Sequence, residues 1–242
     1  MEIHKPKPWH GLREFLKEYG IIVLGVLTAL ALEQVVETLH ERTIASEARE
    51  AVRAEVRENL WWLRKRESLE PCIRERLGEL ADVLARARRG EAFPAVGHIG
   101  DVSHEKITEL RWQTNAQSGR ASLFSGEEQR LMGEMYFTTD QFVEAQARED
   151  DIWSRLHAIQ GENRLGPQDI HDLAVQLAQA RWENARVLLT IQRARQWADR
   201  MHLTPENPNG VESAGELSEQ ICQRLTAPAV APESWEAPGD QP

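Results

Sequence analysis

The sequence predicts an all-α protein in which an N-terminal transmembrane helix continues into an antiparallel extramembrane helical bundle. One observation is a run of fourteen uncharged residues, Tyr19 to Leu32. The other is the recurrence of apolar residues at steps of three and four along the later segments, with no strand-like alternation. The predicted parts are a basic head over 1–18, a transmembrane helix over 19–36 and a bundle over 37–203, with loops near 91–103 and 161–167. A linker, a short helix and a Pro-rich tail follow over 204–242.

The apolar run is long enough to span a bilayer only if its flanks are included. Tyr19 to Leu32 makes about 21 Å of helix, which is short of the roughly 30 Å hydrocarbon core. Extending the helix to 15–36 gives about 33 Å. The extension admits Lys17, which can snorkel, and Glu33, whose charge costs less at the interface than at the centre.

Two other interpretations of this run stay open. A signal peptide would have Ala29-x-Ala31 as its cleavage site, but the preceding region is long and contains acidic residues. The helical pattern also continues past that site, without Pro or Gly, from Val26 to Glu70. A buried helix of a soluble protein is disfavoured because the run is apolar on all faces. An uncleaved anchor is the favoured interpretation.

The charges that flank the run predict its orientation. Four basic residues precede it and two follow it over a similar length, which places the N-terminus in the cytoplasm and the bulk of the chain across the membrane. The four are Lys5, Lys7, Arg13 and Lys17, and the two are Arg42 and Arg49. Gly25 and Ala29 form a pair of small residues that could bring two such helices together.

The N-terminal segment "REFLKEYGIIVLGVLTALALEQVVE" resembles the opening of a family of uncharacterised bacterial, chiefly proteobacterial, single-span membrane proteins. The shared features are a short basic head, a Glu-Tyr/Ile-Gly start to the apolar stretch and an Ala-x-Glu-Gln finish. The segments "TNAQSGRASLFSGEEQ" and "MYFTTDQFVEAQARE" are more loosely similar to the middle of that family. The resemblance implies an inner-membrane location, an all-helical extramembrane part and no assigned activity.

The bundle helices follow in order along the chain. The first continues from the anchor to about Arg66, and a second begins at Ser68 or Pro71 and stops at Gly90. After a loop rich in Gly and Pro, a helix is expected over 104–117, and Ser125 caps the next one. The segment "GENRLGP" separates that helix from the last.

The last helix has the clearest pattern, with core positions alternating by three and four from Ile170 to Met201. This pattern predicts bundle or coiled-coil packing, in which Asn184 either fixes the register or lies at a local polar gap, and it suggests a homodimer along the same seam. The seam includes Leu173, Leu177, Asn184, Val187 and Ile191.

Composition excludes several classes of function. With 39 acidic and 29 basic residues and a net charge of −10, general nucleic-acid binding is not expected. The two cysteines, Cys72 and Cys222, are too few for a disulfide framework or a zinc cluster. They could pair with each other if the bundle lies in an oxidising compartment.

No catalytic, cofactor-binding or metal-binding residues are predicted. Glu37-x-x-His40 has the spacing of half a di-iron site, but no second such motif occurs. One loop gathers four residues that could ligate a metal, in a spacing that matches no recurring pattern. They are His98, Asp101, His104 and Glu105. Ser118, Ser122 and Ser125 lie in no Gly-x-Ser-x-Gly motif.

The function expected from these features is that of a non-enzymatic, membrane-anchored interaction, scaffold or accessory protein. Its partners would be the lipid bilayer and either a second copy or other membrane or periplasmic proteins. The alternative is a ligand-sensing bundle that acts through a partner and uses an aromatic pocket. That pocket would draw on Trp112, Trp153, Trp182 and Trp197, which otherwise serve as bundle filler. An enzyme with an unrecognised site is the third hypothesis.

Overall fold

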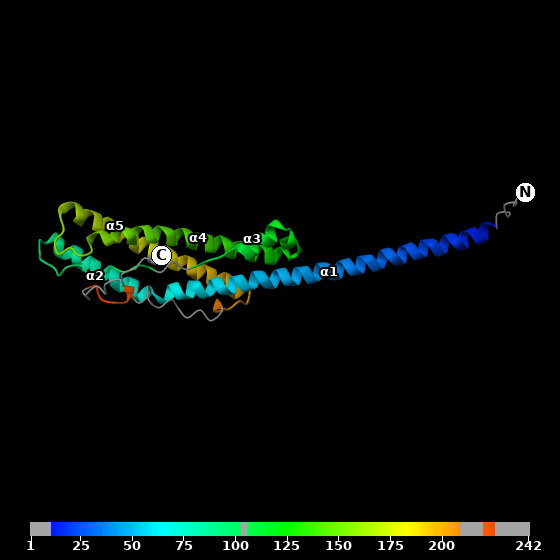
Figure 1. Cartoon of the computed structure of the whole chain (residues 1–242), viewed down its shortest axis with the longest axis horizontal. Helices are drawn as coiled ribbons and strands as arrows, with labels where there is room; N and C mark the ends of the chain where they lie inside the picture. The colour runs from blue at the N-terminus through cyan, green and yellow to red at the C-terminus, as the bar shows by residue number, and fades with distance from the viewer. Residues whose placement is uncertain (1–10, 103–105, 209–219, 226–242) are drawn as a thin grey trace, which may run out of the picture.

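The computed structural model describes residues 11–102, 106–208 and 220–225, and it confirms the all-α class (Figure 1). No strand occurs among these residues. The elements are α1 (Leu12–Ser68), α2 (Glu70–Arg88), α3 (Leu110–Gln117), η1 (Arg120–Leu123), α4 (Gly126–Leu156), η2 (His157–Ile159) and α5 (Pro167–Arg200).

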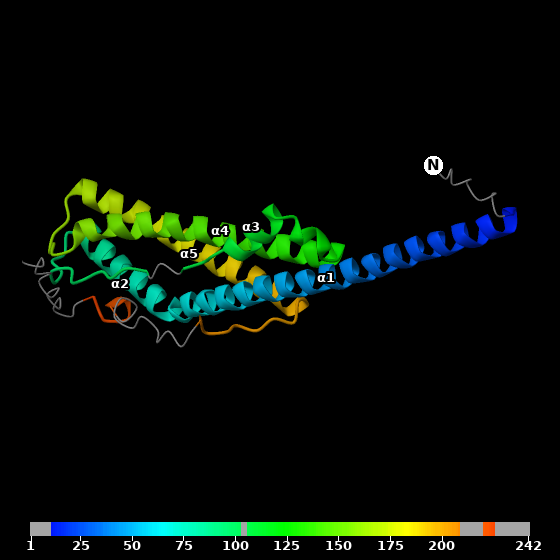
Figure 2. The same ribbon diagram turned by 45° about the vertical axis from the view of Figure 1, so that its right-hand side comes forward.

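Helix α1 is a single unbroken helix of 57 residues, about 86 Å long. Its N-terminal part projects alone from the bundle in both views (Figures 1 and 2). This part contains a segment that is long and apolar enough to cross a membrane, and none of that segment is buried. Tyr19 and Leu32 are 57% and 62% exposed, and Gly25 and Ala29 contact no other element. Burial begins at Ala45 and Ala48, so one rigid helix joins the apolar segment to the bundle.

The chain bends where α1 gives way to α2. Pro71 lies in the first turn of α2, where its missing N–H costs no helical hydrogen bond, whereas a continuous helix would lose one there. Leu69 caps the junction and its side chain is buried. Helix α2 therefore leaves the line of α1 and packs on α5 (Figure 2).

Helices α4 and α5 form an antiparallel hairpin against α1 and α2. We call the end of the bundle from which α1 projects the near end, and the end that holds α2 and η2 the far end (Figure 1). Ser125 caps α4 at the near end with a full capping box, in which the Ser125 hydroxyl accepts from the Glu128 N–H and the Glu128 carboxylate accepts from the Ser125 N–H.

The predicted seam of α5 is the core of the monomer. Leu173, Leu177, Asn184, Val187 and Ile191 are all at most 7% exposed. Because this seam already packs against the other helices of the same chain, it is not available to a second copy. The prediction of a homodimer along this seam therefore does not fit the fold, and any self-association has to use another face.

Two apolar clusters fill the bundle, one toward each end. The near-end cluster includes Val56, Phe142 and Ile191, and the far-end cluster includes Ile73 and Trp153. Each fully buried aliphatic or aromatic side chain contributes about 1.5–3 kcal/mol to stability. Between the two clusters the facing helices contribute charged and amide side chains to the core.

One helix boundary differs from the prediction. A helix was expected over 104–117, but 106–109 are irregular and α3 begins at Leu110. The reason is a side chain of α1, because Asn59 donates to the Thr108 carbonyl (2.8 Å) and accepts from the Thr108 N–H (3.1 Å), which gives this backbone partners outside a helix. Of the predicted short helix near 216–224, residues 216–219 lie outside the described residues; Gln220 and Ile221 are helical, and the chain turns from Cys222 on.

Candidate functional site

A buried polar network, here called the polar node, lies between the two apolar clusters. It consists of Arg66 from α1, Glu70 from α2, Glu149 from α4 and Asn184 from α5. Arg66 Nη2 donates to both carboxylate oxygens of Glu149, at 2.7 and 2.9 Å, and to Asn184 Oδ1 at 2.9 Å. Asn184 Nδ2 donates to Glu70 at 2.8 Å. The node thus joins all four long helices at one level.

Burying the charged residues of the node has a high cost in desolvation free energy. Arg66 is fully buried and Glu149 is 0% exposed, so both charges have lost their hydration. Burial raises the pKa of Glu149 above its usual range; Arg66 opposes this, and the nearby Glu70 and Glu183 add to it. Arg66 Nε and Nη1 have no hydrogen-bond partner within the described part of the chain. Such a node is poorly suited to adding stability and well suited to fixing which residues face each other.

A second buried carboxylate organises the near end. Glu55 accepts hydrogen bonds from the backbone N–H groups of Arg111 (2.8 Å) and Trp112 (3.2 Å), and so α1 caps the N-terminus of α3. The Tyr136 hydroxyl donates to the same carboxylate at 2.6 Å. Burial and this bond raise the pKa of Tyr136, so the phenol stays protonated.

Glu109 and Asp140 form a carboxyl pair beside this cap. Burial raises the pKa of Glu109 to about 7, helped by its hydrogen bond to Asp140 and by the charges of Asp140 and Glu55. The Glu109 carboxyl therefore still carries a proton in a substantial fraction of molecules at neutral pH.

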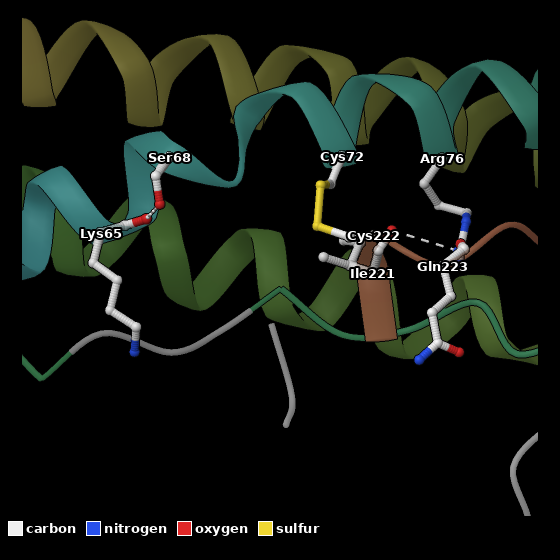
Figure 3. The surroundings of a disulfide bond; sticks show 7 residues. All are labelled: Lys65, Ser68, Cys72, Arg76, Ile221, Cys222 and Gln223. Carbon is white, nitrogen blue, oxygen red and sulfur yellow. Dashed lines mark hydrogen bonds between the residues drawn. A yellow bond between two sulfur atoms is a disulfide. The ribbon is translucent and has the colours of Figure 1, made fainter. Parts of the chain in front are cut away.

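The far end holds a clamp on the C-terminal segment 220–225 (Figure 3). Cys72 of α2 and Cys222 form a disulfide that joins residues 150 positions apart. One helical turn further on, the buried Arg76 donates to the carbonyls of Ile99 and Gln223. Ile221 is 1% exposed in the far-end cluster. Residues 220–225 are therefore part of the bundle.

The loop before α3 packs closely against this segment. Gly100 has a positive φ of 78°, and a Cβ there would lie 3.0 Å from the Ile221 Cα, so only glycine fits. His98 Nε2 lies 3.0 Å from Gln220 Oε1. His157 Nε2 lies 3.0 Å from Asp101 and 3.2 Å from the Gly100 carbonyl. These polar contacts close the far end of the bundle.

The structure does not assemble a metal site from the candidate residues it describes. Glu37 and His40 are exposed on the projecting part of α1. Of the four loop candidates, His98 and Asp101 make the contacts above, while His104 and Glu105 lie outside the described residues. Within the described ranges no three His, Cys, Asp or Glu side chains form a group that could hold a metal ion.

The four tryptophans of the hypothetical aromatic pocket lie in different surroundings. Trp112 stacks on Tyr136, with ring centroids 5.4 Å apart, and Trp153 is buried in the far-end cluster. Trp197 lies under the guanidinium of Arg200, 4.7 Å from its ring centre, and Trp182 is 65% exposed. They line no common pocket in the part of the chain that the structure describes.

The sequence contains a signal for the polar node: charged residues at positions of the apolar stripes. In α4 the core stripe includes Phe142, Ala145 and Ile152, and Glu149 occupies the three-and-four position between the last two. Arg66 likewise continues the α1 stripe three residues after Leu63. Of the four residues of the node, only Asn184 was predicted to lie on a seam; the charged residues at seam positions were not considered as core candidates.

Comparison of the chain with family models, with curated proteins and with solved structures finds no match.

Proposed function

We propose that the protein is a non-enzymatic interaction protein of the bacterial inner membrane, acting as a scaffold or accessory subunit. Its N-terminal head lies in the cytoplasm, α1 crosses the bilayer, and the bundle stands in the periplasm. The observation that carries this proposal is the continuity of α1. The same helix is apolar and uncovered over its first half and is built into the bundle core over its second half.

Two further features support the orientation. More basic residues precede the apolar segment than follow it, which favours a cytoplasmic N-terminus. The disulfide between Cys72 and Cys222 is a kind of bond that persists in oxidising compartments and is rare in the cytosol. A bundle carried on a stiff helix presents its side surfaces to other proteins at a fixed height above the bilayer.

The test is protease protection with a tag at each end of the full chain. Cells are converted to spheroplasts, treated with external protease, and the membranes are blotted for both tags. The expected result is a small protected N-terminal fragment and loss of the C-terminal tag. Survival of both tags in intact spheroplasts would place the bundle in the cytoplasm and refute the orientation.

The cysteines give an independent test in untreated cells. Free thiols are trapped with a maleimide of high mass in acid-quenched cells, with and without prior reduction. We expect labelling only after reduction, and none in a Cys72→Ser, Cys222→Ser double variant. Labelling of the unreduced wild-type chain would contradict the periplasmic location.

A further inference from the structure

Helix α5 has a second apolar face that points away from the core. We call it the α5 stripe: Val175, Ala178, Trp182, Ala185 and Leu189. All five residues are exposed, Trp182 at 65% and Leu189 at 45%. Their spacing of three, four, three and four is that of a coiled-coil seam. A bundle helix normally has polar residues on its solvent face, so an exposed apolar stripe indicates a binding surface. The spacing of its residues matches a partner helix.

The stripe has the size and shape of a helix-docking site. Val175 to Leu189 spans fifteen residues, with about 21 Å of helix rise between the first and the last. A groove of about 410 Å³ runs beside it between α4 and α5, with Ala178 and Trp182 on one wall and Arg148 and Ile152 on the other. A helix laid along α5 would insert apolar side chains beside Trp182 and into this groove.

The borders of the stripe are basic although the protein as a whole is acidic. Arg181, Arg186 and Arg193 flank the stripe and are exposed. Within the described residues, Arg181 and Arg193 have no acidic side chain at ion-pair distance. Arg186 has only Glu183, at 3.8 Å, and Glu183 also pairs with Arg148. These arginines can therefore accept carboxylates from outside the chain.

We propose that the α5 stripe binds an amphipathic helix of a partner protein, with apolar residues at three-and-four spacing and Asp or Glu on both borders. The proposal rests on the proposed function, because it names the partner class of a tethered interaction protein. The apolar spacing defines the helix, and the arginine borders select its charge.

The same charges disfavour a second copy as the occupant. Two chains anchored in one membrane would bring their α5 helices together in parallel. In a parallel pair the border residue at one position faces the partner residue five positions later, so Arg181 would face Arg186 of the second copy. Two such like-charge contacts per dimer oppose assembly.

A bilayer is also a poor fit. The stripe runs along the bundle in the same general direction as α1 (Figure 1). If α1 crosses the membrane, the stripe rises from its surface and cannot lie flat on it.

The test uses the purified full-length protein in detergent micelles and two synthetic helices of about four heptads. Both peptides carry Leu at the apolar positions; one has Glu and the other Lys at the border positions. Fluorescence anisotropy of the labelled peptide reports binding. The Glu peptide is expected to bind and the Lys peptide to bind at least tenfold more weakly.

Three variants of the protein sharpen the result. Trp182→Ala is expected to lower the affinity for the Glu peptide by about 30-fold, which is typical of a tryptophan at the centre of an interface. Arg181→Glu with Arg193→Glu should abolish binding of the Glu peptide and create binding of the Lys peptide. Leu110→Ala, which changes an exposed residue of α3, and Arg164→Glu, which changes an exposed loop arginine, are the matched controls and should leave both affinities unchanged.

Three results would overturn the proposal. The first is equal binding of both peptides, or binding that ignores Trp182→Ala. The second is a dimer by analytical ultracentrifugation that Trp182→Ala makes monomeric, since the occupant would then be a second copy. The third is capture of phosphatidylglycerol vesicles that depends on Trp182. Peptide binding is measured on purified protein in detergent, whereas the spheroplast test measures the orientation in the membrane. A negative result for peptide binding is therefore distinguishable from a negative result for the orientation.

Discussion

Replacing Arg66 with methionine tests whether the polar node sets the stability of the bundle. The substitution keeps an unbranched, flexible side chain but removes the guanidinium group and its charge, which leaves Glu149 buried and without the two bonds at 2.7 and 2.9 Å. Breaking a buried ion pair in this way costs about 3–5 kcal/mol. At about 2–4 °C per kcal/mol for a domain of this size, the unfolding midpoint should fall by roughly 10 °C.

The double variant Arg66→Met with Glu149→Leu is the more informative measurement. It removes both buried charges, including the guanidinium nitrogens Nε and Nη1 that lack partners within the described residues. Replacing a buried pair by apolar side chains is often neutral or stabilising. We expect the free energy of unfolding of the double variant to be no more than about 1 kcal/mol below that of the wild type. The large loss in the single variant and its recovery in the double variant would then give a large coupling energy between the two positions.

The pH dependence of the single variant gives a further check. Because burial raises the pKa of Glu149, the folded state holds this proton more tightly than the unfolded chain, and its stability rises as pH falls toward the ordinary range of the carboxyl. Without Arg66 the pKa of Glu149 rises further, so Arg66→Met should cost less at pH 5 than at pH 8.

Unfolding of the full chain in detergent is followed by tryptophan fluorescence and near-ultraviolet circular dichroism. Arg64→Met, which changes an exposed arginine of α1, is the control and should be close to neutral. Additive losses in the double variant, or an Arg66→Met midpoint equal to that of the wild type, would refute the reasoning.

Three other perturbations have defined outcomes. Glu55→Ala leaves the first N–H groups of α3 without an acceptor and should lower the free energy of unfolding by about 2–3 kcal/mol. Hydrogen exchange should rise first in α3, and unchanged exchange there would contradict the capping role of Glu55. Gly100→Ala should lower the unfolding midpoint more than Gly90→Ala, because both have positive φ but only Gly100 meets another backbone; equal losses would show that the close approach is unimportant. The raised pKa of Glu109 makes the folded state less stable as pH rises from about 4.5 to 8. Asp140→Asn should therefore increase the free energy of unfolding at pH 8 by about 1 kcal/mol and change it little at pH 4.5. If the variant's pH profile of urea unfolding keeps the wild-type shape, the pairing of Glu109 with Asp140 is refuted.

The sequence was sufficient for features that depend on local pattern. The continuous α1, the seam of α5 and the Ser125 cap follow from periodicity and from the chemistry of one or two residues, and the structure has all three. Each is determined within a few turns of the chain.

Most features that depend on pairs of residues distant in the sequence were not predicted; the exception is the pairing of Cys72 with Cys222, which the presence of only two cysteines made a candidate. Helix α3 begins later than expected because Asn59 and Glu55 on another helix hold the preceding backbone. The partner of Arg66 is 83 residues away, and nothing local to either residue indicates it. For the seam of α5 the sequence left bundle packing and a homodimer both open, since periodicity shows that a helix face is covered and does not show by what.

The polar node and the α5 stripe are connected through α5 itself. Asn184, which accepts from Arg66, lies two residues from Trp182 on the opposite side of the same helix. A sliding of α5 by one heptad would remove Asn184 from the guanidinium and leave a buried charge with fewer partners, so the node makes that alternative costly. The register that places Asn184 against Arg66 also places Trp182 outward at a fixed distance along α1 from the apolar segment. If α1 spans a membrane and the α5 stripe binds a helix, as proposed above, this arrangement would make the stiff α1 helix determine the height at which the partner helix binds.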